Sequence, residues 1–240
     1  MFAFYALALL VVFLGVVLNI SGSLHINALL LHFYEPHKVL LMTTTFLTLG
    51  SLARTIVFWK NIKWQEVGGL TLYGILGGFI GGYLIGSVPD KIIALIFILS
   101  GTYFVFRYFK KESVHHAHGN LFLAGFITSL LQAFGLSVGP LRQGYLFAKE
   151  FTLQEVHGTI AVTFLASGTA MILARSIRES IPFSDIYPIF ILFPFMLITM
   201  YLGKRVLYKI PKKIADHIII YSLILSLLAA LPKVIELLQK

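Results

Sequence analysis

The chain has 240 residues, of which 58% are hydrophobic and 12% are charged, and its formal net charge is +9. Soluble domains average about 45–50% apolar and about 25% charged residues, so this composition excludes an ordinary soluble domain. The positive charge does not indicate nucleic-acid binding either, because the Lys and Arg residues lie in short clusters between apolar segments, as membrane-flanking charges do.

Long apolar stretches follow one another along almost the whole chain. In chain order, we expect helices near residues 2–20, 38–58, 66–86, 91–109, 119–134, 155–175, 186–204 and 214–235, and shorter apolar pieces at 24–34 and 140–148. Each long stretch can cross about 30 Å of hydrocarbon at about 1.5 Å per residue. The first stretch lacks a basic leader and a cleavage site, so we expect it to stay in the membrane. The sequence therefore predicts an all-α polytopic membrane protein.

A short pattern, T-F-L-x-x-G-[ST], occurs twice, at Thr45–Ser51 and at Thr163–Thr169. Two further anchors keep the same order: Gly81 and Pro89 match Gly203 and Pro211, and Ser21–Ser23 matches Gly135–Ser137. Transporters commonly consist of two copies of one unit. We therefore predict two repeats, residues 1–113 and residues 114–240.

The Gly/Ser breaks before the two short pieces decide the predicted topology. If eight full spans alternated, Lys and Arg would divide almost equally between the two faces, against the positive-inside rule. If each break is the tip of a re-entrant hairpin, one face holds about twice as many basic residues as the other. That face collects Arg54, Lys60, Lys63, Arg107, Lys110, Lys111, Lys149, Lys204, Arg205, Lys209, Lys212 and Lys213. We prefer this second topology: two inverted repeats, each a broken, re-entrant helical hairpin followed by three transmembrane helices.

Gly74, Gly78, Gly82 and Gly86 form a G-x-x-x-G stripe on one face of the expected helix 66–86. Small residues let helix backbones approach closely in lipid. We interpret the stripe as a packing surface. Lining of a permeation path and contact with a partner protein are the alternatives.

Irregular backbone at membrane depth is tolerated only where protein or a water-filled cavity satisfies it, so the two breaks are candidates for a site. Each precedes a helix start: Ser23 can cap the first, and Ser137 or Gly139 can cap the second, with Pro140 at its first position. Both starts would aim free N–H groups and the positive end of a helix dipole at the bilayer midplane. This predicts an anion site made largely of backbone. The alternative is that the breaks are ordinary turns near the surface.

Polar residues near the breaks and in the repeated helix complete the predicted substrate site, which comprises Asn19, Ser21, Gly22, Ser23, Thr44, Thr45, Gln132, Gly135, Ser137, Gly139, Arg142, Gln143 and Thr163. Arg142 is the strongest candidate, because a guanidinium beside a helix start is a forked donor for sulfonate, sulfite or carboxylate oxygens. In that role, Arg142→Gln would weaken transport and leave folding largely intact. The alternative is that Arg142 snorkels to the interface.

No Asp or Glu lies in the middle of a predicted span, so the titratable candidates that remain are His25, His37 and His157. Of these, we expect His25 or His157 to serve in proton coupling. Efflux of an anion can proceed without coupling. Each negative charge that leaves an inside-negative cell is favoured by about 2.3 kcal/mol per 100 mV. The sequence therefore favours export.

Nothing in the sequence indicates catalysis, a cofactor or a metal site. It contains no cysteine and no H-E-x-x-H, G-x-S-x-G or P-loop motif. His115, His116 and His118 lie in one loop without an acidic or cysteine partner, and we expect them to be solvated. We therefore predict that the protein is not an enzyme and binds no cofactor or metal.

A Gly/Ser break, a Thr-rich helix, a Gly-rich helix ending at Pro89 and a basic loop follow one another, and the same order then recurs, between about Val11 and Leu231. This order resembles the sulfite exporter TauE/SafE family of membrane proteins. The resemblance implies transport of sulfite, sulfonates or similar small anions across a bacterial or archaeal cytoplasmic membrane. It favours Ser21–Ser23, Gly135–Pro140 and the hydroxyls of the two repeated segments as the substrate region. The second break has fewer glycines than family members tend to have, which leaves the substrate open.

The sequence thus predicts a multi-pass transporter of the cell membrane whose partners are a small anion and the lipid bilayer, with a homodimer as one option for its assembly. An anion channel and a non-transporting membrane scaffold are the alternatives. The same half-helix dipoles would serve a channel, and the glycine stripe would serve as the interface of a scaffold.

Overall fold

The computed structural model describes residues 2–17, 22–109, 120–136, 139–178, 181, 183–206, 209 and 212–239, and within these ranges it consists of helices and their connections, without strands. The helices are α1 (Phe2–Val17), α2 (Gly22–Leu30), α3 (Pro36–Val57), α4 (Trp64–Ile85), α5 (Asp90–Phe109), α6 (Thr128–Ala133), α7 (Gly139–Phe147), α8 (Leu153–Arg178), α9 (Phe183–Ile191), α10 (Phe193–Val206) and α11 (Lys212–Gln239). A 3-10 turn, η1 (Trp59–Asn61), follows α3, and a π turn, η3 (Leu123–Ile127), precedes α6. The prediction of an all-α fold is confirmed, and each expected helix is present near its predicted position.

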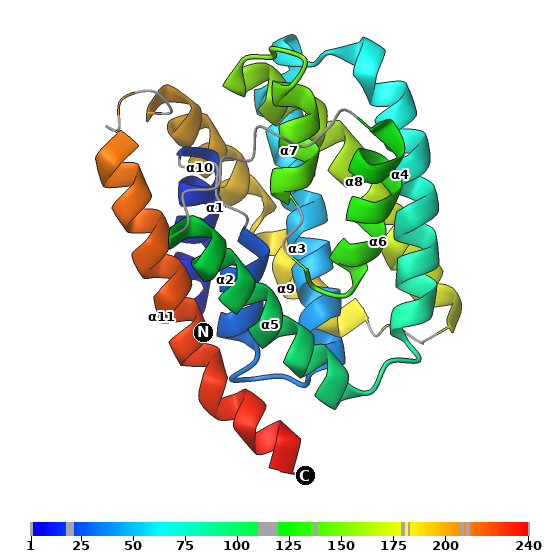
Figure 1. Ribbon diagram of the computed structural model, residues 1–240, viewed down its shortest axis with the longest axis vertical. Coiled ribbons are helices and arrows are strands. Elements are labelled where there is room, and N and C mark those ends of the chain that lie inside the picture. The colour runs from blue at the N-terminus through cyan, green and yellow to red at the C-terminus, as the bar shows by residue number, and fades with distance from the viewer. Residues whose placement is uncertain are drawn as a thin grey trace.

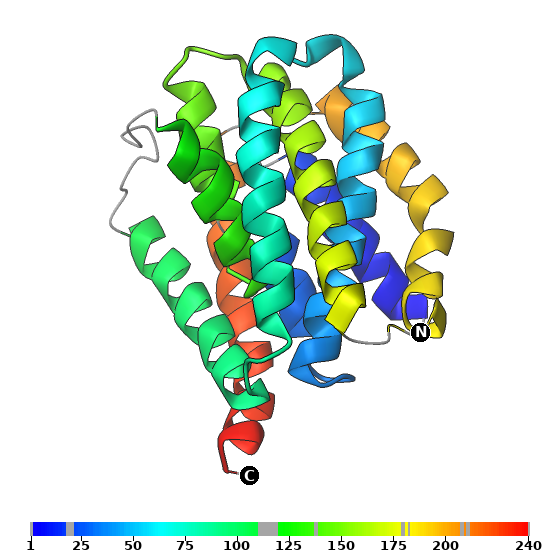
Figure 2. The ribbon, with the colours of Figure 1, turned by 90° about the vertical axis from the view of Figure 1, so that its right-hand side faces the viewer.

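Three long apolar helices, α3, α4 and α8, pack together and form the frame of the molecule (Figures 1 and 2). Each is long and apolar enough to cross a membrane. Two pairs of shorter helices, α1 with α2 and α6 with α7, pack around this frame, and α5 lies beside α11. In each pair, the second helix starts at a predicted break: α2 starts at Gly22 and α7 starts at Gly139.

The glycines of α4 explain how closely the central helices pack. A Cβ atom at Gly78 or Gly82 would collide with the backbone of α8, at Ser167 and Met171 respectively. On the neighbouring face of α4, a Cβ atom at Gly77 would collide with the carbonyl of Phe126 in η3. The interpretation of these glycines as a packing surface is confirmed, and they face helices of the same chain.

This packing predicts a difference between two glycines of the same helix. We expect Gly78→Ala to lower the free energy of unfolding by about 1–3 kcal/mol, because the added methyl group forces α4 away from α8. Gly68→Ala is the matched control, since a Cβ atom there meets nothing within 4 Å and alanine is the better helix former. Thermal unfolding in detergent measures both variants. Equal melting temperatures would contradict the close α4–α8 contact.

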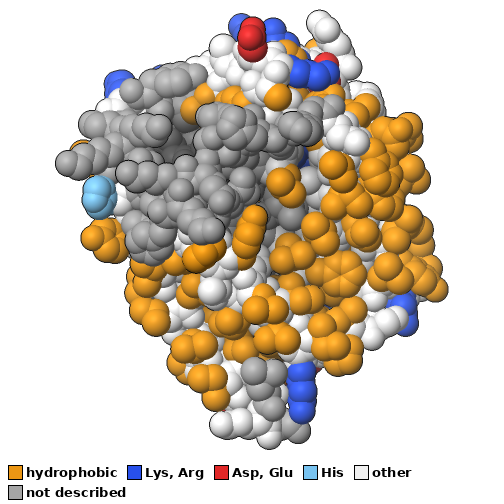
Figure 3. All heavy atoms as spheres, in the orientation of Figure 1, with side chains coloured by type: hydrophobic (Ala, Val, Ile, Leu, Met, Phe, Trp, Pro, Cys, Tyr) orange, Lys and Arg blue, Asp and Glu red, His pale blue; other side chains and the backbone are white. Residues whose placement is uncertain are grey.

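On the face shown in Figure 3, apolar side chains cover most of the surface that is not grey, and charged side chains are few. Large exposed apolar side chains on α4, α10 and α11 contribute to it, including Leu72, Leu76, Phe79, Ile198, Leu202, Leu225 and Leu228. Soluble monomers rarely expose apolar patches larger than a few hundred Å². Together with the apolar helices, this surface identifies a membrane protein.

The α3–α4 connection, the end of α7 and the end of α10 lie at the end of the molecule that is uppermost in Figure 1, which we call the basic end. The sequence places Lys60, Lys63, Lys149, Lys204, Arg205 and Lys209 in or beside these segments. Lys63 pairs with Glu155 at 2.6 Å and Lys149 pairs with Glu66 at 2.7 Å, so the α3–α4 connection is tied to α7 and α8. The hydrogen bond to Glu66 raises the pKa of Lys149 above its ordinary value. At the opposite end of the molecule, His37 at the start of α3 contacts the α4–α5 connection. Its Nε2 atom lies 2.7 Å from the carbonyl of Val88.

Two helices differ from the sequence expectation in their interior. The span expected at 186–204 is divided at Leu192 into α9 and α10. Pro194 lacks an N–H group, and its ring would clash with the carbonyl four residues earlier in a continuous helix, which favours a break just before it. The helix expected at 119–134 contains the π turn η3, which inserts an extra residue into the hydrogen-bonded turn and changes which side chains face the centre.

Candidate functional site

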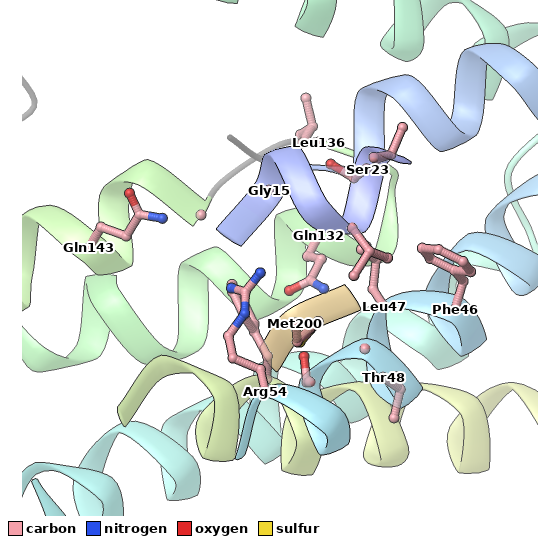
Figure 4. Close-up of a pocket in the computed structure, with 16 residues that line it drawn as sticks. Gly15, Ser23, Phe46, Leu47, Thr48, Arg54, Gln132, Leu136, Gln143 and Met200 are labelled. Carbon is pink, nitrogen blue, oxygen red and sulfur yellow. The ribbon is translucent and has the colours of Figure 1, made fainter. Parts of the chain in front are cut away.

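A cavity of about 90 Å³ lies between the broken helices and α3 (Figure 4). Its walls come from α1, α2, α3, α6, α7, α8, α10 and the segment after α6, with the lining residues Val11, Val12, Gly15, Ser23, Phe46, Leu47, Thr48, Gly50, Ser51, Arg54, Gln132, Leu136, Gly139, Gln143, Phe164 and Met200. A cavity needs about 10–15 Å³ to hold one water, so this one can hold a small ion with some water. It is smaller than the roughly 300–1,000 Å³ pockets that bind drug-sized molecules.

Arg54 supplies the positive charge of the cavity. Leu47, Gly50, Ser51 and Arg54 recur at the spacing of one helix face, so this face of the C-terminal half of α3 lies against the cavity. Within the part of the chain that the structure describes, the guanidinium has no hydrogen-bond or ion-pair partner, and its Nε atom is buried. A cation held in low-dielectric surroundings without a counterion attracts an anion strongly.

Gln132 faces Arg54 across the cavity. In Figure 4 the amide of Gln132, from α6, and the guanidinium of Arg54 point toward the same space. The Oε1 atom of Gln132 is buried and accepts no hydrogen bond from any described residue. The amide nitrogen offers two further donors to a bound oxyanion. Two polar side chains without strong protein partners therefore converge on one small space.

The starts of two helices reach the same cavity. Ser23 lies in the first turn of α2, Gly139 is the first residue of α7, and both line the cavity. The first N–H groups of a helix have no intrahelical acceptor, and the helix dipole places a partial positive charge there. The first N–H groups of α2 and α7 and the guanidinium of Arg54 therefore all make the electrostatic potential in the cavity more positive.

The predicted substrate residues divide into three groups. Ser23, Gln132, Gly139 and Gln143 line the cavity. Thr44, Thr45, Gly135, Arg142 and Thr163 are not among the lining residues, and Gly22 is the first residue of α2. Asn19, Ser21 and Ser137 lie outside the described residues, as do His115, His116 and His118.

Several hydroxyls of the predicted site bond their own helices instead. Thr45 donates to the carbonyl of Leu41 at 2.9 Å, and Thr163 donates to the carbonyl of Ile160 at 2.9 Å. This is the usual behaviour of Thr in apolar helices. Gly135 has φ +81° and packs against Phe97, so its role in the structure is the tight turn after α6.

Arg142 lies behind the cavity wall and is fully buried. Its guanidinium stacks on the ring of Phe164 at 4.2 Å, and the same ring lines the cavity. All three guanidinium nitrogens donate to protein oxygens: Nε to the carbonyl of Ala124 (3.0 Å), Nη1 to the hydroxyl of Thr163 (3.1 Å), and Nη2 to the hydroxyls of Ser129 (2.6 Å) and Thr128 (2.7 Å). The snorkelling alternative is wrong, because the group does not reach the surface. Arg142 binds the π turn η3 to α8.

The two histidines considered for proton coupling occupy different places. His25 lies on α2, with Nε2 3.1 Å from the hydroxyl of Ser222 on α11. His157 lies in the first turns of α8 and is 1% exposed. Neither lines the cavity, and the ring of His157 lies 5.5 Å from that of Phe58, one turn after Arg54 on α3. Among the described residues no group of three or more metal-ligating side chains comes together.

These features define a polytopic membrane protein with an internal, positively charged cavity between broken helices. The sequence matches the family described as "Sulfite exporter TauE/SafE" over residues 4–231, and the chain belongs to this family of membrane transporters. The family resemblance read from the sequence is therefore confirmed over nearly the whole chain. No match is found among curated proteins or among solved structures.

Proposed function

We propose that this protein is a secondary transporter that exports sulfite or a similarly small sulfur oxyanion across the cytoplasmic membrane of a bacterium or archaeon, and that the anion binds beside Arg54. The observation that carries this proposal is a cationic side chain in a small cavity, without an anionic partner in the part of the chain that the structure describes. The volume of about 90 Å³ favours a compact anion over a larger organic sulfonate. Among the described residues that line it, none is an Asp or Glu that would repel an anion.

Two inverted repeats, residues 1–113 and 114–240, are the proposed framework for alternating access. In this arrangement α1 of the first repeat corresponds to α6 of the second, and α4 corresponds to α10. The contact between α4 and α6 then has its counterpart in the contact between α10 and α1. The equivalent helices α3 and α8 also contact each other, as do α5 and α11. The repeated motifs meet where Thr48 packs on Gly168. These pairings support a two-fold relation between the halves.

The basic end gives the proposed orientation. Cytoplasmic loops carry an excess of Lys and Arg, so the end with Lys60, Lys63 and Lys149 faces the cytoplasm. There Lys204 donates to the carbonyl of Val57 at 2.8 Å and to Asn61 Oδ1 at 3.3 Å, which ties α10 to the α3–α4 connection. Opening the cavity to the cytoplasm requires these contacts to separate. An inside-negative potential then favours the departure of an anion to the other side.

Flux from proteoliposomes tests the proposed function. We expect efflux of sulfite that saturates with concentration and accelerates when sulfite is present on the opposite side. A current that follows the potential without saturating would support the anion channel. If purified protein moves neither sulfite nor a sulfonate, the scaffold alternative stands and the transporter proposal fails.

A further inference from the structure

We propose that the cavity selects sulfur oxyanions with three oxygens and an apex that is not oxygen, and that Met200 is the residue that rejects a fourth oxygen. This inference rests on the proposed function, because it assumes that an anion binds beside Arg54. It goes further, since it separates sulfite and thiosulfate from sulfate and phosphate, which have a similar charge and size.

Few polar side chains of the cavity are available to an anion. In Figure 4 the guanidinium of Arg54 and the amide of Gln132 point toward the same space. Thr48 also lines the cavity, but its hydroxyl donates to a carbonyl of its own helix at 2.7 Å. Ser23 and Gln143 line it as well, and each already interacts with another group of the protein. The donors for an anion therefore come chiefly from one region of the wall.

Much of the remaining wall is apolar. Its apolar members are Val11, Val12, Phe46, Leu47, Leu136, Phe164 and Met200. Of these, Val12, Phe46 and Met200 are at most 7% exposed and belong to the main apolar core. A cavity of about 90 Å³ leaves an anion little room for a hydration shell, so its oxygens depend on donors from the wall. The apolar side chains supply none.

Met200 brings this apolar wall close to Arg54. It lies on α10, which packs against both α1 and α3, and its side chain is 2% exposed. A Cβ atom at Gly50 would lie 3.7 Å from the Cε atom of Met200, so the methyl group of Met200 rests on α3 at Gly50. Gly50 lies one helical turn before Arg54. The thioether therefore borders the cavity within one turn of its cationic residue.

The shapes of the anions determine which of them fits such a cavity. Sulfite is a pyramid with three oxygens and a lone pair at its apex, and thiosulfate has a terminal sulfur at the apex, which is a weak hydrogen-bond acceptor. Both can turn their oxygens toward Arg54 and Gln132 and their apex toward Met200. Sulfate and phosphate have oxygen at every corner of a tetrahedron. One of these oxygens then faces an apolar group and loses its water without gaining a donor, which weakens binding.

Calorimetric titration of the detergent-solubilised protein with thiosulfate and with sulfate tests the inference. The two anions carry the same charge and differ in one atom. We expect thiosulfate to bind about 10- to 100-fold more tightly than sulfate, and sulfite to be preferred over sulfate as well. Selection by size alone would give the opposite order for this pair, because thiosulfate is the larger anion.

Met200→Gln should reverse the preference. Glutamine has nearly the length of methionine and carries an amide that can donate to a fourth oxygen. We expect sulfate affinity to rise by about tenfold and thiosulfate affinity to fall, so that the two become similar. Met200→Leu is the matched control, because it keeps the position apolar and should keep the wild-type preference. If Met200 had only a packing role, Met200→Gln would weaken both anions alike.

Wild-type protein that binds sulfate as tightly as thiosulfate would overturn the inference and leave the proposed function standing, even if Met200→Gln did not fold. A folded Met200→Gln that keeps the wild-type preference would overturn the role of Met200 as well. A wild type that binds neither sulfite nor thiosulfate would remove both proposals.

Discussion

Arg54→Gln is expected to weaken sulfite binding by about 10- to 100-fold and to leave the protein folded. A hydrogen bond to a charged group contributes about 1.5–3 kcal/mol, and each 1.4 kcal/mol corresponds to a factor of ten in the dissociation constant. The variant removes the positive side chain of the cavity and leaves the helix starts and Gln132 in place. Binding measured by calorimetry, and the half-saturating concentration of efflux, should both change by this factor.

The stability of the same variant is part of the prediction. Arg54 has no hydrogen-bond partner among the described residues, so replacing it breaks no protein contact. Its charge is partly buried without a counterion, which costs free energy in the empty protein. We therefore expect the melting temperature without ligand to stay the same or to rise. Arg178→Gln is the matched control, because Arg178 is an exposed arginine that bonds the carbonyl of Tyr83 at 3.2 Å, away from the cavity. Equal sulfite affinity in the two variants would exclude Arg54 from the site.

Arg54, which is half-buried, and Arg142, which is fully buried, show how differently two arginines inside a helical bundle can act. Both lie within the helices, and the ring of Phe164 separates Arg142 from the cavity that Arg54 lines. Arg142 donates to oxygens from η3, α6 and α8, whereas Arg54 donates to no oxygen of a described residue. An arginine whose donors are all occupied by the protein stabilises one arrangement of helices. An arginine whose donors are free is available to a ligand.

The sequence was sufficient for the helices and for the position of the two breaks. Continuous apolar runs give the spans, and Gly22 and Gly139 start new helices because Gly and Ser interrupt the runs before them. Four predicted residues, Ser23, Gln132, Gly139 and Gln143, also line the cavity. The helix starts at Gly22 and Gly139 could be predicted because they depend on local sequence alone.

The remaining features depend on contacts between distant segments. Arg54 lies near the end of a span, where a charge normally flanks the membrane, and it becomes an internal group only because α1 and α6 cover it. The π turn η3 has no signal in its apolar sequence. Its carbonyls are satisfied by Arg142 from another helix, and this could not be read from residue spacing. Pro194 indicates a break between α9 and α10, but the continuous apolar residues around it favoured the prediction of a single span.

Arg142→Gln is expected to destabilise the protein, which is the opposite of the outcome expected from sequence alone. The substitution leaves buried oxygens around η3 without their donors, and each such group costs about 1–3 kcal/mol. Glutamine can replace part of this bonding, so we expect a loss of about 2–4 kcal/mol in the free energy of unfolding. For a chain of this size, that corresponds to a fall of roughly 5–15 °C in melting temperature. Arg142→Lys should lose less, because it keeps the charge and one donor group but not the planar fork.

Comparison with Arg178→Gln separates a structural role of Arg142 from a direct role in binding. If Arg142 holds η3 against α8, Arg142→Gln melts at a lower temperature than Arg178→Gln. The fraction of Arg142→Gln that remains folded then binds sulfite with an affinity close to that of the wild type. If Arg142 contacts the anion, the variant keeps its melting temperature and loses affinity, as Arg54→Gln is expected to do. The distinction follows from where the donors of the guanidinium point before any anion arrives, and in the structure they point to Ala124, Thr128, Ser129 and Thr163.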